Sequence, residues 1–284
     1  GLGLAAGAAL FSLGLACVFF ATDPLGAVHV AERVALPALL SSGLVGFLLR
    51  RHGQGRLAAL LFLLSYLLKG AVLFHPSYFY NDVRNNRRYV EALRDDPGAL
   101  EPRSRAAQER LGVAYPRIVG GKKYAFPYSP VFFLPFGLLP HDPTAIEEGL
   151  KQAVVACSAA EVPIVFLLAV RVFGAGAGVL PALLAVFLPI QYSRLLLAMW
   201  STVGAHVFDG LALLLALDWA QRPASRRAFG LTAAAVLASY LTYVASLFNM
   251  SLFTGLAGLL ARPLRWRFWA LGALGALLTV ALLY

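Results

Sequence analysis

LAALLFLLSYLLKGAVLFHPSYFYNDVRNNRRYVEALRDDPG, residues 57–98, joins an apolar run to the one long polar run of a largely apolar chain. Residues 57–74 carry a single charge, Lys69, and have a length close to the roughly 20 residues that cross a hydrocarbon core. Residues 75–98 contain three Asp, four Arg and an Asn pair, which lipid does not tolerate. The stretch therefore predicts a membrane helix followed by a polar surface that carries the chemistry.

The composition of the whole chain agrees with a membrane protein. Hydrophobic residues make up 60% of the 284 residues and charged residues 13%, and the mean hydropathy is +0.73, more apolar surface than a soluble domain buries. The net charge of +10 comes from Arg in short loops between apolar runs, a pattern that orients helices in a membrane and argues against nucleic-acid binding. Cys17 and Cys157 lie in apolar runs and have no disulfide or metal-site spacing.

Apolar runs separated by short polar links predict an all-α fold, a polytopic transmembrane helical bundle of about nine spans forming a single domain over residues 1–284. Because the chain begins without Met and ends inside an apolar run, we expect it to be truncated at both ends. The expected spans are residues 1–22, 34–49, 57–74, 149–173, 179–190, 206–219, 229–246 and 247–261, and the apolar run after 267.

Loop charge predicts the orientation of these spans. The dense basic loop at residues 50–56 is expected in the cytoplasm, so residues 75–149 form an extracytoplasmic loop. Within that loop, residues 82–94 predict a surface helix in which Val83, Val90 and Leu93, flanked by Tyr89, form an apolar stripe against the membrane surface. Residues 103–111 predict a second amphipathic piece.

Prolines 127, 130, 135 and 140 argue against one straight membrane helix after this loop. We interpret residues 127–139 as a short broken or re-entrant segment on the outer side. If the segment crossed the membrane fully, the basic loops at 218–227 and 262–267 would both lie outside, against the orientation rule. With the segment on the outer side, both loops lie in the cytoplasm.

Asp82 is the strongest catalytic candidate, with two compatible interpretations. Its carboxylate can cap the free N–H groups at the start of the surface helix. It can also be a general base or a metal-linked carboxylate that activates an acceptor hydroxyl at the membrane surface. Asp95 and Asp96 precede Pro97-Gly98 and are typical of a solvated helix end, so we rank them below Asp82.

A surplus of positive charge is expected on the same outer side. One interpretation is attraction to anionic lipid headgroups. The other is a clamp for a phosphate or pyrophosphate on a lipid-linked substrate, since Arg binds phosphate oxygens in bidentate fashion. The cations are Arg84, Arg87, Arg88, Lys122, Lys123 and Arg194.

Four further ionisable residues fall within or beside the spans. Lys69 and Glu161 lie inside spans, where a charge usually faces a cavity or a partner. His206 and Asp209 are three residues apart and share a helix face, which favours a structural hydrogen bond over a metal site, for which two ligands are too few. The sequence has no P-loop, zinc motif or dinucleotide fingerprint, and it predicts no cofactor, with a divalent metal left open.

Three segments together resemble the GT-C glycosyltransferases, membrane enzymes that use polyprenyl-phosphate sugars. They are FYNDVRNNRRYVEAL, YAFPYSPVFFLPFGLLP and LPIQYSRLLLAMWSTVGAHVFDGLALLLALDW, and the resemblance covers roughly residues 74–219. FPYSPVFFLPFGLLP is similar to the Tyr- and Pro-rich segment of bacterial polyprenyl-phosphate-mannose-dependent mannosyltransferases. Two features differ from the family pattern: Asn81 stands where a second acidic residue is common, and three expected spans precede the loop instead of one.

The resemblance implies an inverting sugar transfer with Asp82 as the catalytic carboxylate. The implied donor is a polyprenyl-phosphate sugar and the acceptor a hydroxyl of a lipid, glycan or protein, at the outer face of a bacterial plasma membrane. The outer Arg and Lys residues would hold the donor phosphate, and Tyr128, Arg194, His206 and Asp209 would belong to the substrate site. The alternative is a transporter or flippase for an anionic lipid-linked substrate, whose route the basic groups would line.

Overall fold

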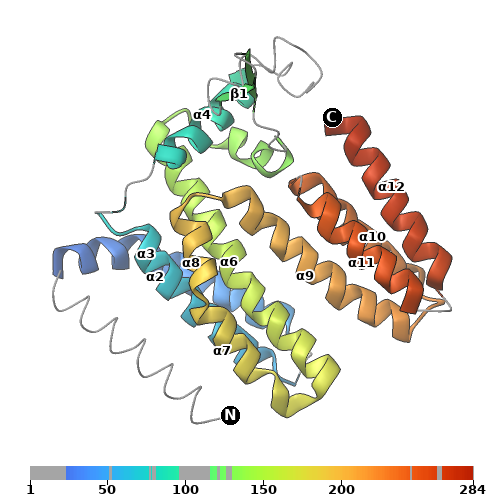
Figure 1. Ribbon diagram of the computed structural model, residues 1–284. Coiled ribbons are helices and arrows are strands. Elements are labelled where there is room, and N and C mark those ends of the chain that lie inside the picture. The colour runs from blue at the N-terminus through green and yellow to red at the C-terminus, as the bar shows by residue number, and fades with distance from the viewer. Residues whose placement is uncertain are drawn as a thin grey trace. The chain divides into compact units, whose positions relative to one another are not determined.

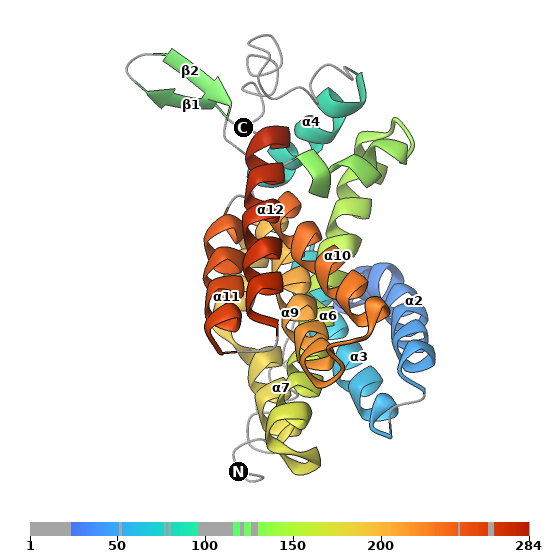
Figure 2. The same cartoon turned by 90° about the vertical axis from the view of Figure 1, so that its right-hand side faces the viewer.

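The computed structural model describes residues 24–50, 53–76, 78, 81–95, 116–119, 122–125, 130–243, 245–260 and 264–283. Over these ranges the chain is helical apart from one β-hairpin (Figures 1 and 2). It divides into two compact units. The first unit comprises Gly1–Tyr80 and Lys151–Val203, and the second unit comprises Asn81–Leu150 and Gly204–Tyr284. The sequence predicts a single domain, and each unit combines stretches that are far apart in that sequence.

The chain is a membrane protein, because five helical stretches of the described ranges are long and apolar enough to cross a bilayer. These correspond to the expected spans at 34–49, 57–74, 149–173, 179–190 and 206–219. The expected span at 1–22 lies outside the described residues, and the count of about nine spans stays a prediction. The five are Val28–Leu48, Gly55–Leu73, Pro143–Phe173, Ala175–Leu196 and Trp200–Gln221.

The first unit is built around the packing of α2 (Pro24–Leu48) on α3 (Gly55–Leu73). Gly70 permits the close approach: a Cβ at that position would lie 2.5 Å from Val34 Cγ1. Ser42 Oγ donates to Ala59 O at 3.0 Å across the same interface, a polar contact typical of membrane helices. Residues 151–173 of α6 (Pro143–Phe173), with η4 (Ala175–Ala177), α7 (Val179–Phe187) and α8 (Pro189–Leu196), complete the unit.

Proline and glycine divide the segment between α6 and α9 into short pieces. Gly174 has φ +91°, a left-handed conformation that ends α6. Pro189 lies in the first turn of α8, where its missing N–H is not needed. The predicted span at 179–190 therefore contains α7 and, after Leu188, only the first two residues of α8.

The second unit contains α4 (Asn81–Asp95), a hairpin of β1 (Pro116–Val119) and β2 (Lys122–Ala125), and two 3₁₀ turns, η2 (Pro130–Phe132) and η3 (Leu134–Leu138). The start of α6 and most of α9 (Trp200–Gln221) also belong to it. Three further helices, α10 (Arg226–Thr242), α11 (Ser246–Leu260) and α12 (Arg265–Leu283), pack side by side (Figures 1 and 2). Their core includes the buried rings of Trp219 and Phe268, with centroids 5.0 Å apart.

Two expectations for the polar loop are confirmed and one is wrong. The predicted helix at 82–94 forms as α4, and its apolar stripe exists. The stripe packs on the protein rather than on the membrane surface, because η3 folds against α4. The proline-rich segment is broken as expected, into η2 and η3, while residues 103–111 and 127–129 lie outside the described residues. The hairpin was not expected, although Gly120-Gly121 between its strands is a turn signal.

Candidate functional site

Asp82, the predicted catalytic carboxylate, lies in the first turn of α4. Its Oδ1 accepts a hydrogen bond from Asn85 Nδ2 at 3.0 Å, which orients the carboxylate. The helix starts at Asn81, so Asp82 lies inside the first turn and is not the N-cap residue. A negative charge in the first turn stabilises the helix through its dipole. Asp82 is partly exposed.

Aromatic packing fixes one face of α4, on the same side of the helix as Asp82, which lies about two turns before Tyr89. Tyr89 is 2% exposed and its ring centroid lies 4.9 Å from that of Phe133, in edge-to-face geometry. Phe133 stands between the two 3₁₀ turns and is 1% exposed. Val83, Val90 and Leu93 of α4 are also buried. This packing anchors α4 and so supports the polar residues that the helix carries.

The three predicted phosphate contacts on α4 separate into two kinds. Arg87 pairs with two carboxylates, its Nη1 lying 3.1 Å from Glu147 Oε1 and its Nε 3.4 Å from Glu91 Oε1. Since Glu147 belongs to the start of α6, this pair ties α4 to α6 within the second unit. Arg84 and Arg88 are exposed, so they are better placed to meet an anion from solvent.

The other predicted site residues lie on three different elements. Lys122 and Lys123 are on β2, where they pair in register with Val119 and Ile118 of β1. Arg194 is half-exposed on α8 and belongs to the first unit, whereas Asp82 belongs to the second. Tyr128 lies outside the described residues. A shared site for all of these side chains stays a prediction.

His206 and Asp209 form the centre of a polar cluster inside the second unit. His206 Nδ1 lies 3.4 Å from Asp209 Oδ2, as the three-residue spacing predicts. Ser239 of α10 donates to Asp209 Oδ1, and Asn249 Nδ2 of α11 lies 3.4 Å from Asp209 Oδ2. The cluster therefore joins three helices through one carboxylate that is 13% exposed.

Such a cluster can bind a polar group of a substrate or hold three helices in register. Carboxylates among apolar helices are rare and are usually functional or paired. In the described ranges no group of three or more His, Cys, Asp and Glu side chains could hold a metal ion. Asp209 accepts hydrogen bonds there from Ser239 and Asn249.

A second polar network lies inside the first unit. Lys69 has no exposed surface, and its Nζ donates to Ser158 O at 2.7 Å. Glu161 on α6 accepts from Gln191 Nε2 at 2.6 Å and interacts electrostatically with Lys69. These two contacts explain how the carboxylate of Glu161 is accommodated inside a span, which the sequence leaves open.

Tyr66 extends this network along α3 and α6. Its hydroxyl donates to Gln152 Oε1 at 2.5 Å, and Gln152 Nε2 donates to Arg33 O at 2.6 Å. Together with Lys69 and Ser158, these contacts place a row of polar groups between apolar helices, where each polar group needs a partner.

The sequence indicated the carboxylates of these clusters but not the side chains that donate hydrogen bonds to them. Ser239, Asn249 and Asn85 each hold a predicted carboxylate. Ser239 and Asn249 could have been found as polar residues within expected spans. Asn85 could have been found because it lies one helical turn from Asp82. Comparison of the chain with protein-family models, curated proteins and solved structures gave no match.

Proposed function

We propose that this protein is a GT-C-type glycosyltransferase that moves a sugar from a polyprenyl-phosphate donor to a hydroxyl acceptor, with inversion. The observation that carries the proposal is the placement of Asp82: a half-exposed carboxylate in the first turn of an anchored polar helix, held by Asn85. In sequence this helix directly follows the apolar helix α3. A base at this position meets a lipid-linked donor and a hydroxyl acceptor at the boundary between lipid and water.

The proposed step is a direct displacement at the anomeric carbon. The acceptor hydroxyl gives its proton to Asp82 while its oxygen forms a bond to that carbon. The bond from the carbon to the phosphate oxygen breaks, and the phosphate leaves with the electron pair. Attack opposite the leaving group inverts the anomeric configuration.

Arg84 and Arg88 are the proposed contacts of the donor phosphate. Both are exposed and four residues apart, so they share one side of α4, which is the side away from Asp82 and Tyr89. A guanidinium group matches phosphate oxygens and stabilises the charge that develops on the leaving group. Arg87 contributes indirectly, by holding α4 to Glu147.

The proposed orientation follows loop charge. The loops at 50–56, 218–227 and 262–267 face the cytoplasm, and α4 with the residues around it faces the opposite side of a bacterial plasma membrane. About nine spans satisfy this arrangement, with the proline-rich segment remaining on the outer side. The acceptor is then a lipid, glycan or protein of the cell envelope.

Replacement of Asp82 tests the proposal. Asp82→Asn keeps the size of the side chain but removes the base, so sugar transfer should fall by about a hundredfold or more. The measurement is release of polyprenyl phosphate from a labelled polyprenyl-phosphate sugar by protein in liposomes. Asp95→Asn at the other end of α4, where the carboxylate is exposed and contacts Arg94, should keep at least half of the activity. Full activity of Asp82→Asn would refute the assignment.

Transport of an anionic lipid-linked substrate is the second candidate, and the polar network of the first unit favours it. Lys69, Glu161 and Gln191 lie inside apolar helices, as groups along a transport route do. Transport consumes no donor, so the same liposomes distinguish the two functions. Movement of intact labelled lipid across the bilayer without release of polyprenyl phosphate, abolished by Lys69→Met, would establish transport instead.

A further inference from the structure

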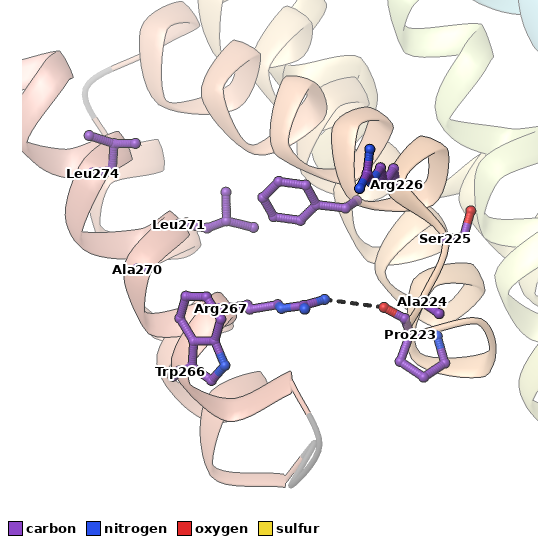
Figure 3. Close-up of a pocket in the computed structure, with 10 residues that line it drawn as sticks. Pro223, Ala224, Ser225, Arg226, Trp266, Arg267, Ala270, Leu271 and Leu274 are labelled. Atoms are coloured by element: carbon purple, nitrogen blue, oxygen red, sulfur yellow. Dashed lines mark hydrogen bonds between the residues drawn. The ribbon is translucent and has the colours of Figure 1, made fainter.

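A cavity of about 440 Å³ opens between α10 and α12 in the second unit (Figure 3). It is lined by the residues just before α10, by the first turn of α10 and by one face of α12. None of the residues proposed for sugar transfer takes part in it. Its volume is within the range of pockets that hold small molecules or parts of lipids.

The lining of the cavity carries two positive charges. Arg226 of α10 and Arg267 of α12 both line it, and no lining residue is acidic. Arg267 Nη1 donates to Pro223 O at 3.2 Å, and its guanidinium carbon lies 5.4 Å from the Trp266 ring centroid. Figure 3 shows Arg267 reaching from α12 toward the chain before α10. Arg267 is therefore held in place while other guanidinium N–H groups remain to bind an anion.

The rest of the cavity is apolar. Phe229 of α10 lines it, and Ala270, Leu271 and Leu274 line it from one side of α12 (Figure 3). Leu274 is 52% exposed and Trp266 67% exposed, so the groove opens at the surface of the unit. In a membrane protein such a surface faces lipid chains or headgroups.

We propose that this cavity binds an anionic phospholipid. The lipid phosphate would contact Arg226 and Arg267, and an acyl chain would lie along Phe229, Leu271 and Leu274. Two cations without a lining carboxylate complement a negatively charged headgroup, and basic pockets between membrane helices bind such headgroups. The exposed indole of Trp266 fits the boundary between headgroups and chains. This inference is independent of the proposed sugar transfer.

Two double variants test the site, and each of them removes two positive charges. Arg226→Gln with Arg267→Gln removes the two cavity cations. Arg227→Gln with Arg265→Gln removes two exposed neighbours that do not line the cavity. Binding of dioleoyl phosphatidylglycerol to purified protein is measured by native mass spectrometry, with phosphatidylcholine for comparison. Phosphatidylglycerol should bind at least tenfold more weakly to the cavity pair and within twofold of the unmodified protein to the control pair.

Ala270→Phe tests the apolar part without changing charge. It fills the groove on α12, so phosphatidylglycerol binding should fall at least fivefold while the melting temperature without lipid stays unchanged. Equal losses in the cavity and control pairs would overturn the proposal in favour of general charge attraction. Equal affinity for phosphatidylcholine would also overturn it, as would glycerol phosphate binding as tightly as the lipid. Arg226→Gln alone, which leaves the Arg267 contact intact, provides a folded variant if the double substitution unfolds.

Discussion

Asp209 illustrates how a buried charge is accommodated between apolar helices. Removing a carboxylate from water costs several kcal/mol unless partners replace the lost hydrogen bonds. His206, Ser239 and Asn249 supply those partners from three helices. The His206 contact follows from a spacing of three residues, whereas Ser239 and Asn249 lie 30 and 40 residues from Asp209. Sequence alone could therefore predict the first partner but not the other two.

The Ser239 hydroxyl should contribute measurably to stability. Ser239→Ala leaves a carboxylate oxygen of the partly buried Asp209 without its donor, and we expect a loss of about 1–3 kcal/mol. Chemical denaturation in detergent micelles measures the change. Ser193→Ala, at an exposed hydroxyl that bonds to Pro189 O of its own helix, should change stability by less than about 0.5 kcal/mol.

A double-mutant cycle then assigns the Ser239 effect to Asp209. If the hydroxyl acts through the carboxylate, Asp209→Asn and Ser239→Ala should be coupled by about 0.5–3 kcal/mol. Additive effects would show that the hydrogen bond does not stabilise the cluster.

Among the elements, α12 packs through its glycines. A Cβ at Gly275 would lie 2.6 Å from the ring of Tyr240, which is fully buried and hydrogen-bonded to Ser251 at 3.0 Å. A Cβ at Gly272 would collide with Thr254 of α11. Small residues at such contacts allow membrane helices to approach closely.

Gly275→Ala should destabilise the protein by about 1–3 kcal/mol, because the held Tyr240 ring cannot move aside. Gly255→Ala on α11 is the matched control, since nothing lies within 4 Å of its added Cβ. There the better helix propensity of Ala should give a gain of about 0.5–1 kcal/mol. Melting temperatures of both variants in one detergent make the comparison. A stabilised Gly275→Ala variant would contradict the packing of α12 on α10.

A secondary-structure element was predicted correctly where the apolar residues of one helix face define it. The apolar stripe of α4 follows from 3.6-residue periodicity, so the helix and its buried face were predicted correctly. The surface that covers the stripe depends on Phe133, 44 positions after Tyr89, and periodicity carries no information about it. The hairpin at 116–125 has short strands without clear alternation, and only the Gly pair indicated it.

For the whole molecule, the proposed orientation predicts opposite accessibility of two exposed arginines. In a background with Cys17→Ala and Cys157→Ala, Arg84→Cys should react with a membrane-impermeant maleimide added to intact cells. Arg227→Cys should react only after permeabilisation. Labelling of both positions in intact cells would contradict the proposed topology, and so would labelling of Arg227→Cys alone.

Composition and run length were sufficient to predict a helical membrane protein. They were not sufficient to predict the two units, because each unit depends on contacts between distant stretches. Lys69 and Ser158, for instance, are 89 residues apart, and neither sequence neighbourhood indicates the other. The same limit applies to the predicted site, whose residues are distributed over both units.

The Lys69 contact has a consequence for how the protein is made. The ribosome adds roughly 5–20 residues per second, so Ser158 emerges roughly 4 to 18 seconds after Lys69. Throughout that interval, α3 carries an ammonium group whose eventual acceptor does not yet exist. The nascent α2–α3 hairpin must therefore stay beside water, lipid headgroups or the insertion machinery until α6 arrives.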